Sequence, residues 1–364
     1  MRGFIYFSFI AIEPYFFLRI MFAFLILLAV LFAFILAYTF YKRRMAGNKK
    51  IWQEKITNLI SEIIFLNEGE PLPAALISDN KKLLLKPCFR QDIIDELIHA
   101  KKNLSGSFTI NLVKFYELLE LDQDSVRKLN HPKWHIKSKG IHELSSMKQK
   151  KYLKEIFRLT NNENNFVRNE AQSALVSFYG FSGLRFLNVA TYPISEWQQI
   201  LFLNKLNEVQ PKELEVIGKW LQSSNDSVVV FSLKLATNYN CYQFYDAVIE
   251  CLHHSSLQVK INALEYLKKM PGENLHDHIM GYYDGENKTL KLLILDILKE
   301  TGSEKELDFL LKQLHHSDDG IKAAAAQTIS SLHPLGSSFL QSHLFADEYP
   351  WKAIFLQIQN DHAA

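Results

Sequence analysis

Cysteine, glycine and proline are all scarce in this 364-residue chain, which holds three, 14 and 10 of them. The cysteines, Cys88, Cys241 and Cys251, are odd in number and lack any framework spacing, which excludes a disulfide scaffold and indicates reduced thiols in a cytosolic body. Glycine is too sparse for a loop that cradles phosphates, and the patterns CxxC, HExxH, GxSxG, the P-loop and GxGxxG are all missing. We therefore expect no cofactor, no metal site and no enzymatic activity.

An excess of charge of one sign is also missing, because the formal net charge is only +2 at pH 7. Proteins that bind nucleic acid carry a strong basic field, so we expect no nucleic-acid partner. The run KQKKYLKE at 148–155 offers four lysines that a nucleic-acid groove would use: Lys148, Lys150, Lys151 and Lys154. A solvated helix face is the simpler interpretation of that run.

The histidines offer only weak signs of chemistry. The pairs His253-His254 and His315-His316 lie 62 residues apart, and His276-Asp277-His278 places two imidazoles on different sides of a helix. A pair that repeats in register favours a structural role, in which the side chains meet the unpaired carbonyls at a helix end.

One long apolar run stands apart from the rest of the chain. Residues 20–41 read IMFAFLILLAVLFAFILAYTFY, 22 residues without a charge, and about 20 suffice to cross a membrane as a helix. A basic cluster follows: Lys42, Arg43, Arg44, Lys49 and Lys50. The positive-inside bias then predicts a single-pass membrane anchor, with the remainder of the chain in the cytoplasm.

Two alternatives accompany this anchor. A secretory signal peptide is disfavoured by the length of the run and by the lack of a small-residue cleavage site after it. A further apolar stretch at 3–12 is too short to span, so it is either interfacial or lies upstream of a true start at Met21.

Residue types that cap helices recur at steps of 30 or 31 residues: Asn164, Ser195, Asn225, Ser256, Asn287 and Asp318. Each accepts hydrogen bonds from the free N–H groups at a helix start. An apolar anchor stands three positions after most of these caps, and the register extends one repeat further back: Ile136, Val167, Val228, Val259, Leu290 and Ile321. Only Gln198, after Ser195, breaks the pattern. Small and then apolar residues follow at steps of four, on the same helix face.

A turn-forming residue and a second apolar segment complete each repeat. Two such short helices cannot bury their faces alone, whereas stacked pairs form a continuous core. We predict an all-α fold: a right-handed α-solenoid of about seven helix pairs, preceded by one transmembrane helix. Four parts are expected: a tail and anchor at 1–44, a helical linker with capping helices at 45–130, the repeats at 131–345 and a C-terminal capping helix at 346–364.

The register resembles that of HEAT-like repeats, including the short repeats of bilin-lyase relatives. The best-matching stretches are NNFVRNEAQSAL (164–175), LQVKINALEYL (257–267) and DDGIKAAAAQTI (318–329). The resemblance implies a basic residue after the anchor, which forms a ladder here: Lys137, Arg168, Lys260, Lys291 and Lys322. In such repeats this ladder ties neighbouring units through charge pairs and helix ends. Binding of a ligand is the alternative role.

The apolar anchor followed by WHIKSKGIHEL (134–144) also resembles membrane-tethered HEAT-repeat proteins of Bacteroidetes-type bacteria. We expect a membrane-tethered scaffold that contacts the bilayer through 20–41 and binds a protein partner, such as a membrane enzyme complex. The alternative is a HEAT-like enzyme or ligand-handling protein similar to bilin lyases. That alternative needs a polar pocket, built around Cys241, Cys251, His253 and His276.

Overall fold

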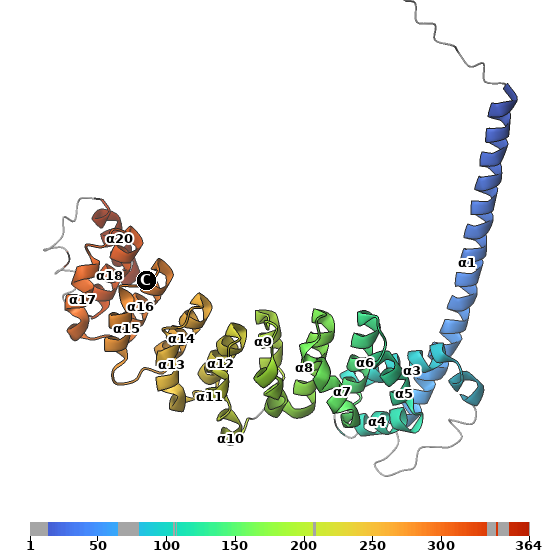
Figure 1. Ribbon diagram of the computed structural model, residues 1–364, viewed down its shortest axis with the longest axis horizontal. Coiled ribbons are helices and arrows are strands. Elements are labelled where there is room, and N and C mark those ends of the chain that lie inside the picture. Colours follow the sequence, from blue (N-terminus) through green and yellow to red (C-terminus); the bar gives the residue numbers. More distant parts are fainter. Residues whose placement is uncertain are drawn as a thin grey trace, which may run out of the picture. The chain divides into compact units, whose positions relative to one another are not determined.

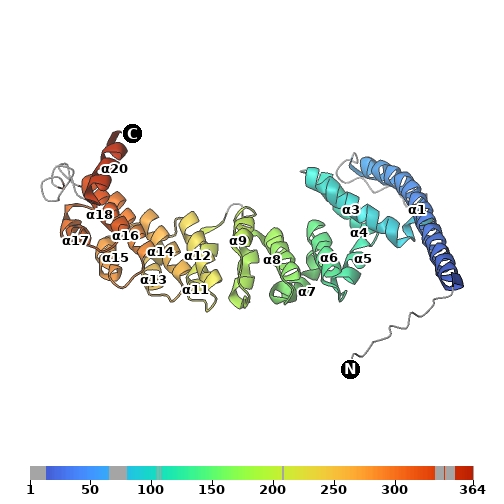
Figure 2. The same ribbon diagram turned by 90° about the horizontal axis from the view of Figure 1, so that it is seen from above.

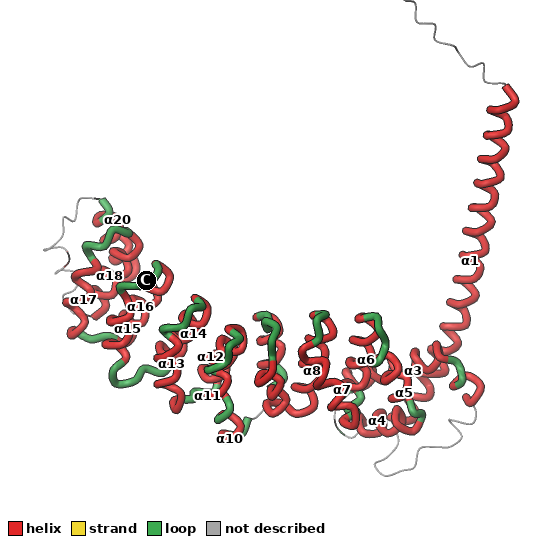
Figure 3. Tube along the Cα trace, in the orientation of Figure 1, coloured by secondary structure: helices red, strands yellow, loops and turns green. Residues whose placement is uncertain are grey.

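The computed structural model describes residues 14–64, 80–104, 106, 108–206, 209–332, 340 and 349–363. Within these ranges every regular element is helical and no strand occurs (Figure 3). The chain divides into two compact units, Met1–Ser125 and Val126–Ala364. The apolar stretch at 3–12 lies outside the described residues, as does most of the predicted repeat end at 333–345.

The first unit begins with one helix, α1 (Pro14–Ile64), drawn in blue in Figure 1. Within its 25-residue segment Leu18–Lys42, an 18-residue window reaches a mean hydropathy of 3.2, and none of that window is buried. This segment is long and apolar enough to cross a membrane. A signal sequence near an N-terminus would meet the same criteria of length and composition. The helix continues without a break past residue 44.

The last third of α1 packs into a small bundle with α3 (Pro87–Asn103) and α4 (Phe108–Leu118). Apolar side chains from the three helices form its core: Ile56, Ile60, Ile63, Phe89, Ile93, Ile94, Leu97, Leu112, Phe115 and Tyr116. The bundle includes most of α5 (Leu121–Leu129). The apolar segment of the chain is therefore joined to a folded body by one helix without a linker.

The second unit is a stack of helix pairs, so the predicted HEAT-like α-solenoid is confirmed. The first helices of the pairs are α6 (Trp134–Ser146), α8 (Asn165–Tyr179), α9 (Glu196–Leu203), α12 (Asp226–Asn238), α14 (Leu257–Lys269), α16 (Lys288–Thr301) and α18 (Asp319–Leu332). The second helices include α7 (Leu153–Arg158), α11 (Ile217–Trp220), α13 (Tyr245–Cys251), α15 (Leu275–Tyr283) and α17 (Leu307–Gln313). Figure 2 shows the first and second helices of this unit as two layers.

Short helices fill the remaining connections: η1 (Lys150–Tyr152), η2 (Leu159–Asn161), α10 (Pro211–Leu214), η4 (Tyr242–Phe244) and η5 (Glu304–Glu306). At the far end, α20 (Trp351–Ala363) packs on α18 and buries Ile354, Phe355 and Ile358.

The repeat anchors occupy the core between the layers. Five of them are at most 1% exposed: Val167, Val228, Val259, Leu290 and Ile321. Ile136 is a correction to the predicted set, because its side chain is only half-buried. It lies on α6, the first helix of the stack, so no earlier repeat completes its surroundings.

One repeat departs from the helix-pair pattern. After α8, the second element is a ten-residue 3₁₀ helix, η3 (Gly180–Val189), and such long 3₁₀ runs are uncommon. Gly180 has φ +57°, a left-handed conformation that favours glycine. Gly183 packs against the backbone of α8, where a Cβ atom would overlap the Leu175 carbonyl oxygen and lie 2.8 Å from Val176 Cα. This close approach fixes η3 against the end of α8.

Candidate functional site: a pocket with a basic rim

The predicted helix caps lie at the starts of the first helices. The side chains of Asn164, Ser195, Asn225 and Asn287 each accept a backbone N–H from the first turn that follows, and Asp318 accepts those of Gly320 and Ile321. Ser256 is a correction, because its side chain makes no capping hydrogen bond. The turn before α14 is held instead by His254, whose Nδ1 accepts the Ser256 N–H at 3.1 Å.

This histidine contact recurs and corrects the expected role of the histidine pairs. His316 Nδ1 accepts the Asp318 N–H at 3.0 Å, and His131 Nδ1 accepts the Lys133 N–H at 3.1 Å. Asn162 and Ser223 accept the corresponding N–H groups of Asn164 and Asn225. In all five places, the side chain two positions before the first residue of the turn accepts the backbone N–H of that residue. The three histidines accept through a ring nitrogen, and Asn162 and Ser223 accept through a side-chain oxygen. We predicted instead that the paired histidines would contact carbonyl groups at the helix ends, and in such a contact the histidine has to donate the hydrogen bond.

The basic ladder makes structural contacts of several kinds. Arg168 donates to the carbonyls of Asn162 at 2.6 Å and Glu163 at 3.2 Å, and its guanidinium lies 4.3 Å from the centre of the Tyr192 ring. Burial lowers the pKa of Arg168. These contacts tie α8 to the turn before it and to the turn before α9.

The lysines of the ladder differ in the groups that they contact. Lys260 Nζ lies 2.8 Å from Glu286, in the turn before the next repeat, whereas Lys322 pairs with Asp319 on its own helix at 2.8 Å. Lys291 lies over the Tyr283 ring at 5.1 Å, and Lys137 is half-buried on α6. Lys322 thus departs from the expected tie between units, since an acidic residue three positions away on α18 is nearer.

The residues suggested for a ligand-handling pocket do not form a reactive set. Cys241 and Cys251 are both buried, and burial raises the pKa of Cys241 and brings the pKa of Cys251 to about 11. A thiol with a raised pKa holds little of the nucleophilic thiolate at neutral pH. His276 is engaged by Glu306 at 3.0 Å and Thr301 at 3.1 Å. Across the described residues, no group of three or more His, Cys, Asp or Glu side chains is placed to hold a metal.

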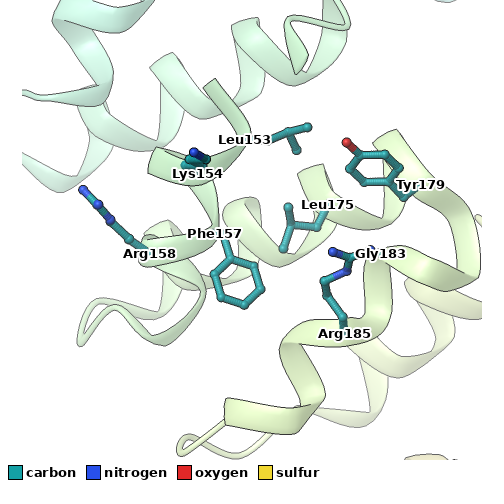
Figure 4. Close-up of a pocket in the computed structure, with 8 residues that line it drawn as sticks. All are labelled: Leu153, Lys154, Phe157, Arg158, Leu175, Tyr179, Gly183 and Arg185. Atoms are coloured by element: carbon teal, nitrogen blue, oxygen red, sulfur yellow. The ribbon is translucent and has the colours of Figure 1, made fainter. Parts of the chain in front are cut away.

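A pocket of about 360 Å³ opens where η3 replaces the usual second helix. Eight residues from three elements line it: Leu153, Lys154, Phe157 and Arg158 from α7, Leu175 and Tyr179 from α8, and Gly183 and Arg185 from η3 (Figure 4). The floor is apolar. We call this site the basic-rimmed pocket.

Three cations and one exposed aromatic ring form the rim of the basic-rimmed pocket. Lys154, Arg158 and Arg185 are exposed, and none of them has an ion-pair partner in the part of the chain that the structure describes. Tyr179 is 44% exposed, with Lys150 Nζ 5.5 Å and the Arg185 guanidinium 5.9 Å from the centre of its ring. No carboxylate lines the pocket. Its chemistry suits a ligand that joins an apolar group to negative charge.

The sequence alone did not reveal this pocket. Lys154 was assigned to a solvated face, and Arg158, Tyr179 and Arg185 carried no motif. The available signal was the stretch GFSGLRFL (180–187), where two glycines three positions apart interrupt a segment expected to be an α-helix.

No known protein family matches the sequence, and no curated protein does. Solved structures that match include importin beta, 12% identical with a TM-score of 0.40, over 86% of this chain and 49% of importin beta. Human deoxyhypusine hydroxylase in complex with glycerol is 12% identical with a TM-score of 0.28, over 87% and 98% of the two chains. The complex of CpcE and CpcF of phycocyanin lyase from a Nostoc species is 9% identical with a TM-score of 0.23, over 82% and 97%. Likenesses this distant transfer neither activity nor partner to this chain.

Proposed function

We propose that this protein is a membrane-tethered scaffold whose repeat array binds a protein partner. The observation that carries the proposal is the basic-rimmed pocket: an apolar floor with three exposed cations on its rim, none of which has an ion-pair partner among the described residues. Stacked repeats present extended surfaces that suit protein partners. The apolar segment of α1 supplies the tether, and a membrane enzyme complex is the kind of partner that a tethered array would meet.

The proposed topology places the repeat array in the cytoplasm of a bacterium, with α1 in the inner membrane. The basic cluster after the apolar segment supports this orientation. Membrane-impermeant thiol labelling of a Cys88→Ser, Ala364→Cys variant tests it, since the exposed Cys88 thiol is removed and the C-terminal thiol should react only after the cells are opened. Labelling of intact cells would contradict the proposed orientation.

The binding function is tested by crosslinking in intact membranes, followed by purification of the tagged full-length chain. We expect one protein to be recovered in near-stoichiometric amount, and its recovery to fall when Arg158 and Arg185 are both changed to Glu. Recovery of no protein, or of the same mixture as from an unrelated tagged membrane protein, would contradict a scaffold.

The ligand-handling alternative is addressed by a separate variant. The combination Cys251→Ala and His253→Ala removes the thiol and imidazole that this alternative relies on. We expect partner recovery to be unchanged, because the Cys251 thiol is buried and has a raised pKa. Loss of recovery with an unchanged circular dichroism spectrum would favour the alternative.

A further inference from the structure

The floor of the basic-rimmed pocket is shaped for one bulky apolar side chain. Leu175 is only 4% exposed, while Leu153 and Phe157 are half-buried and partly open to the pocket. The volume of about 360 Å³ lies at the low end of the range for small-molecule sites, roughly 300–1,000 Å³. A Leu, Met, Phe or Trp side chain would remove the apolar floor from water, which favours binding in proportion to the area covered.

The rim cations are spread out, and they do not converge on one point. Figure 4 shows Arg158 and Arg185 on opposite sides of Phe157, with Lys154 at the upper left, between Leu153 and Arg158. A single phosphate or lipid headgroup would meet only one of them, whereas carboxylates spaced along a peptide would meet several. Arginine suits such contacts, because its planar fork binds a carboxylate through two parallel hydrogen bonds.

The pocket is held open by contacts that need no ligand. Gly183 fixes η3 against α8 through the close approach to the Leu175 carbonyl. Arg185 Nε donates to the Ser182 carbonyl at 3.2 Å, which restrains the guanidinium end of its side chain. A preformed site loses less conformational entropy on binding than one that must be ordered.

We propose that the basic-rimmed pocket receives an acidic segment of the partner protein, with one large apolar side chain seated on the floor and flanking carboxylates paired with Lys154, Arg158 and Arg185. This inference rests on the proposed scaffold function and names the chemistry of the partner. Unpaired basic charge around an apolar floor is the complement of such a segment.

The test is selection of a random displayed peptide library on the full-length chain in nanodiscs of neutral phosphatidylcholine. We expect enriched peptides that place several Asp or Glu residues around one Leu, Met, Phe or Trp. A labelled peptide of that class should bind about tenfold more weakly to an Arg158→Glu, Arg185→Glu double variant, because two attractions become repulsions. Lys312→Glu, a charge reversal at an exposed lysine on α17, should leave binding unchanged.

Several outcomes would overturn the inference. Enrichment of no peptide, enrichment of peptides without acidic residues, or equal loss of binding in the Lys312→Glu control would each do so. Vesicles containing phosphatidylserine form a second arm. If they bind with the same dependence on Arg158 and Arg185 and displace the peptide, the site serves an anionic lipid instead.

The two proposals fail in different ways. If crosslinking in membranes recovers a partner from wild type and from the double variant alike, the scaffold stands and the acidic-segment inference falls. If no partner is recovered from wild type, the scaffold itself falls.

Discussion

Glu143 on α6 is fully buried, and its carboxylate lies 2.6 Å from Lys128 Nζ. Burying a carboxylate is unfavourable unless a partner compensates for the water that it loses. Lys139 lies 4.0 Å from the same carboxylate, at the edge of ion-pair distance. The stability of the first repeat therefore depends strongly on Lys128.

Replacing Lys128 by Met should lower the free energy of unfolding by about 3 kcal/mol, because it leaves Glu143 buried without its nearest cation. Denaturant unfolding of the chain in detergent, followed by circular dichroism, measures this. Lys268→Met is the control, because Lys268 pairs with the exposed Asp296 and Glu300 and should cost less than about 1 kcal/mol. Equal losses in the two variants would contradict the role given to Lys128.

Glu306 makes a pH-dependent contribution to the stability of the folded chain. Burial acts to raise its pKa, but hydrogen bonds from the Ser303 N–H at 2.7 Å and hydroxyl at 2.9 Å, together with His276, outweigh burial and hold the pKa below its usual range. A lowered carboxyl pKa contributes stability above the unfolded pKa and loses it as pH falls through the folded pKa. Wild type should therefore lose more stability than Glu306→Gln between about pH 5 and pH 3, as thermal melts would measure. Parallel losses in the two proteins would contradict this assignment.

At the scale of elements, the sequence predicted the positions of the first helices of the repeats better than the positions of the second helices. A cap, an anchor and a small residue recur on most of the first helices, and five predicted caps make their hydrogen bonds. The conformation of η3 was not predictable, because it depends on a backbone contact between Gly183 and Leu175 that no local pattern encodes. The side chains around the basic-rimmed pocket were likewise brought together by packing between two repeats.

Gly183 and Gly281 form a matched pair for testing the η3 contact. Gly183→Ala should destabilise the protein by about 2 kcal/mol or more and weaken partner recovery, because the new methyl group meets the α8 backbone. Gly281→Ala, on α15, meets nothing within 4 Å and should stabilise the chain by about 0.5–1 kcal/mol through helix propensity. Thermal melts compare the two, and a neutral Gly183→Ala would contradict the close packing of η3.

At the scale of the whole chain, the all-α fold, the repeat period and the apolar helix were predictable, because each arises from a long periodic pattern. The pocket was not predictable from the sequence, because it combines ordinary lysines, arginines and apolar residues rather than a catalytic motif. The continuous helix α1 ties the apolar segment directly to the bundle that includes Ile56, Ile60 and Ile63. A tether without a linker would keep the bundle close to the bilayer surface.

The most direct test of the tethered scaffold is crosslinking in intact membranes, comparing the full-length chain with a chain that begins at Asn48. The account predicts that the full-length chain recovers one defined membrane-associated protein and that the shortened chain, with an unchanged circular dichroism signature for its repeats, recovers far less of it. Equal recovery by both chains would contradict the role of the tether. Recovery of a small molecule with the shortened chain, and of no protein with either, would contradict the scaffold.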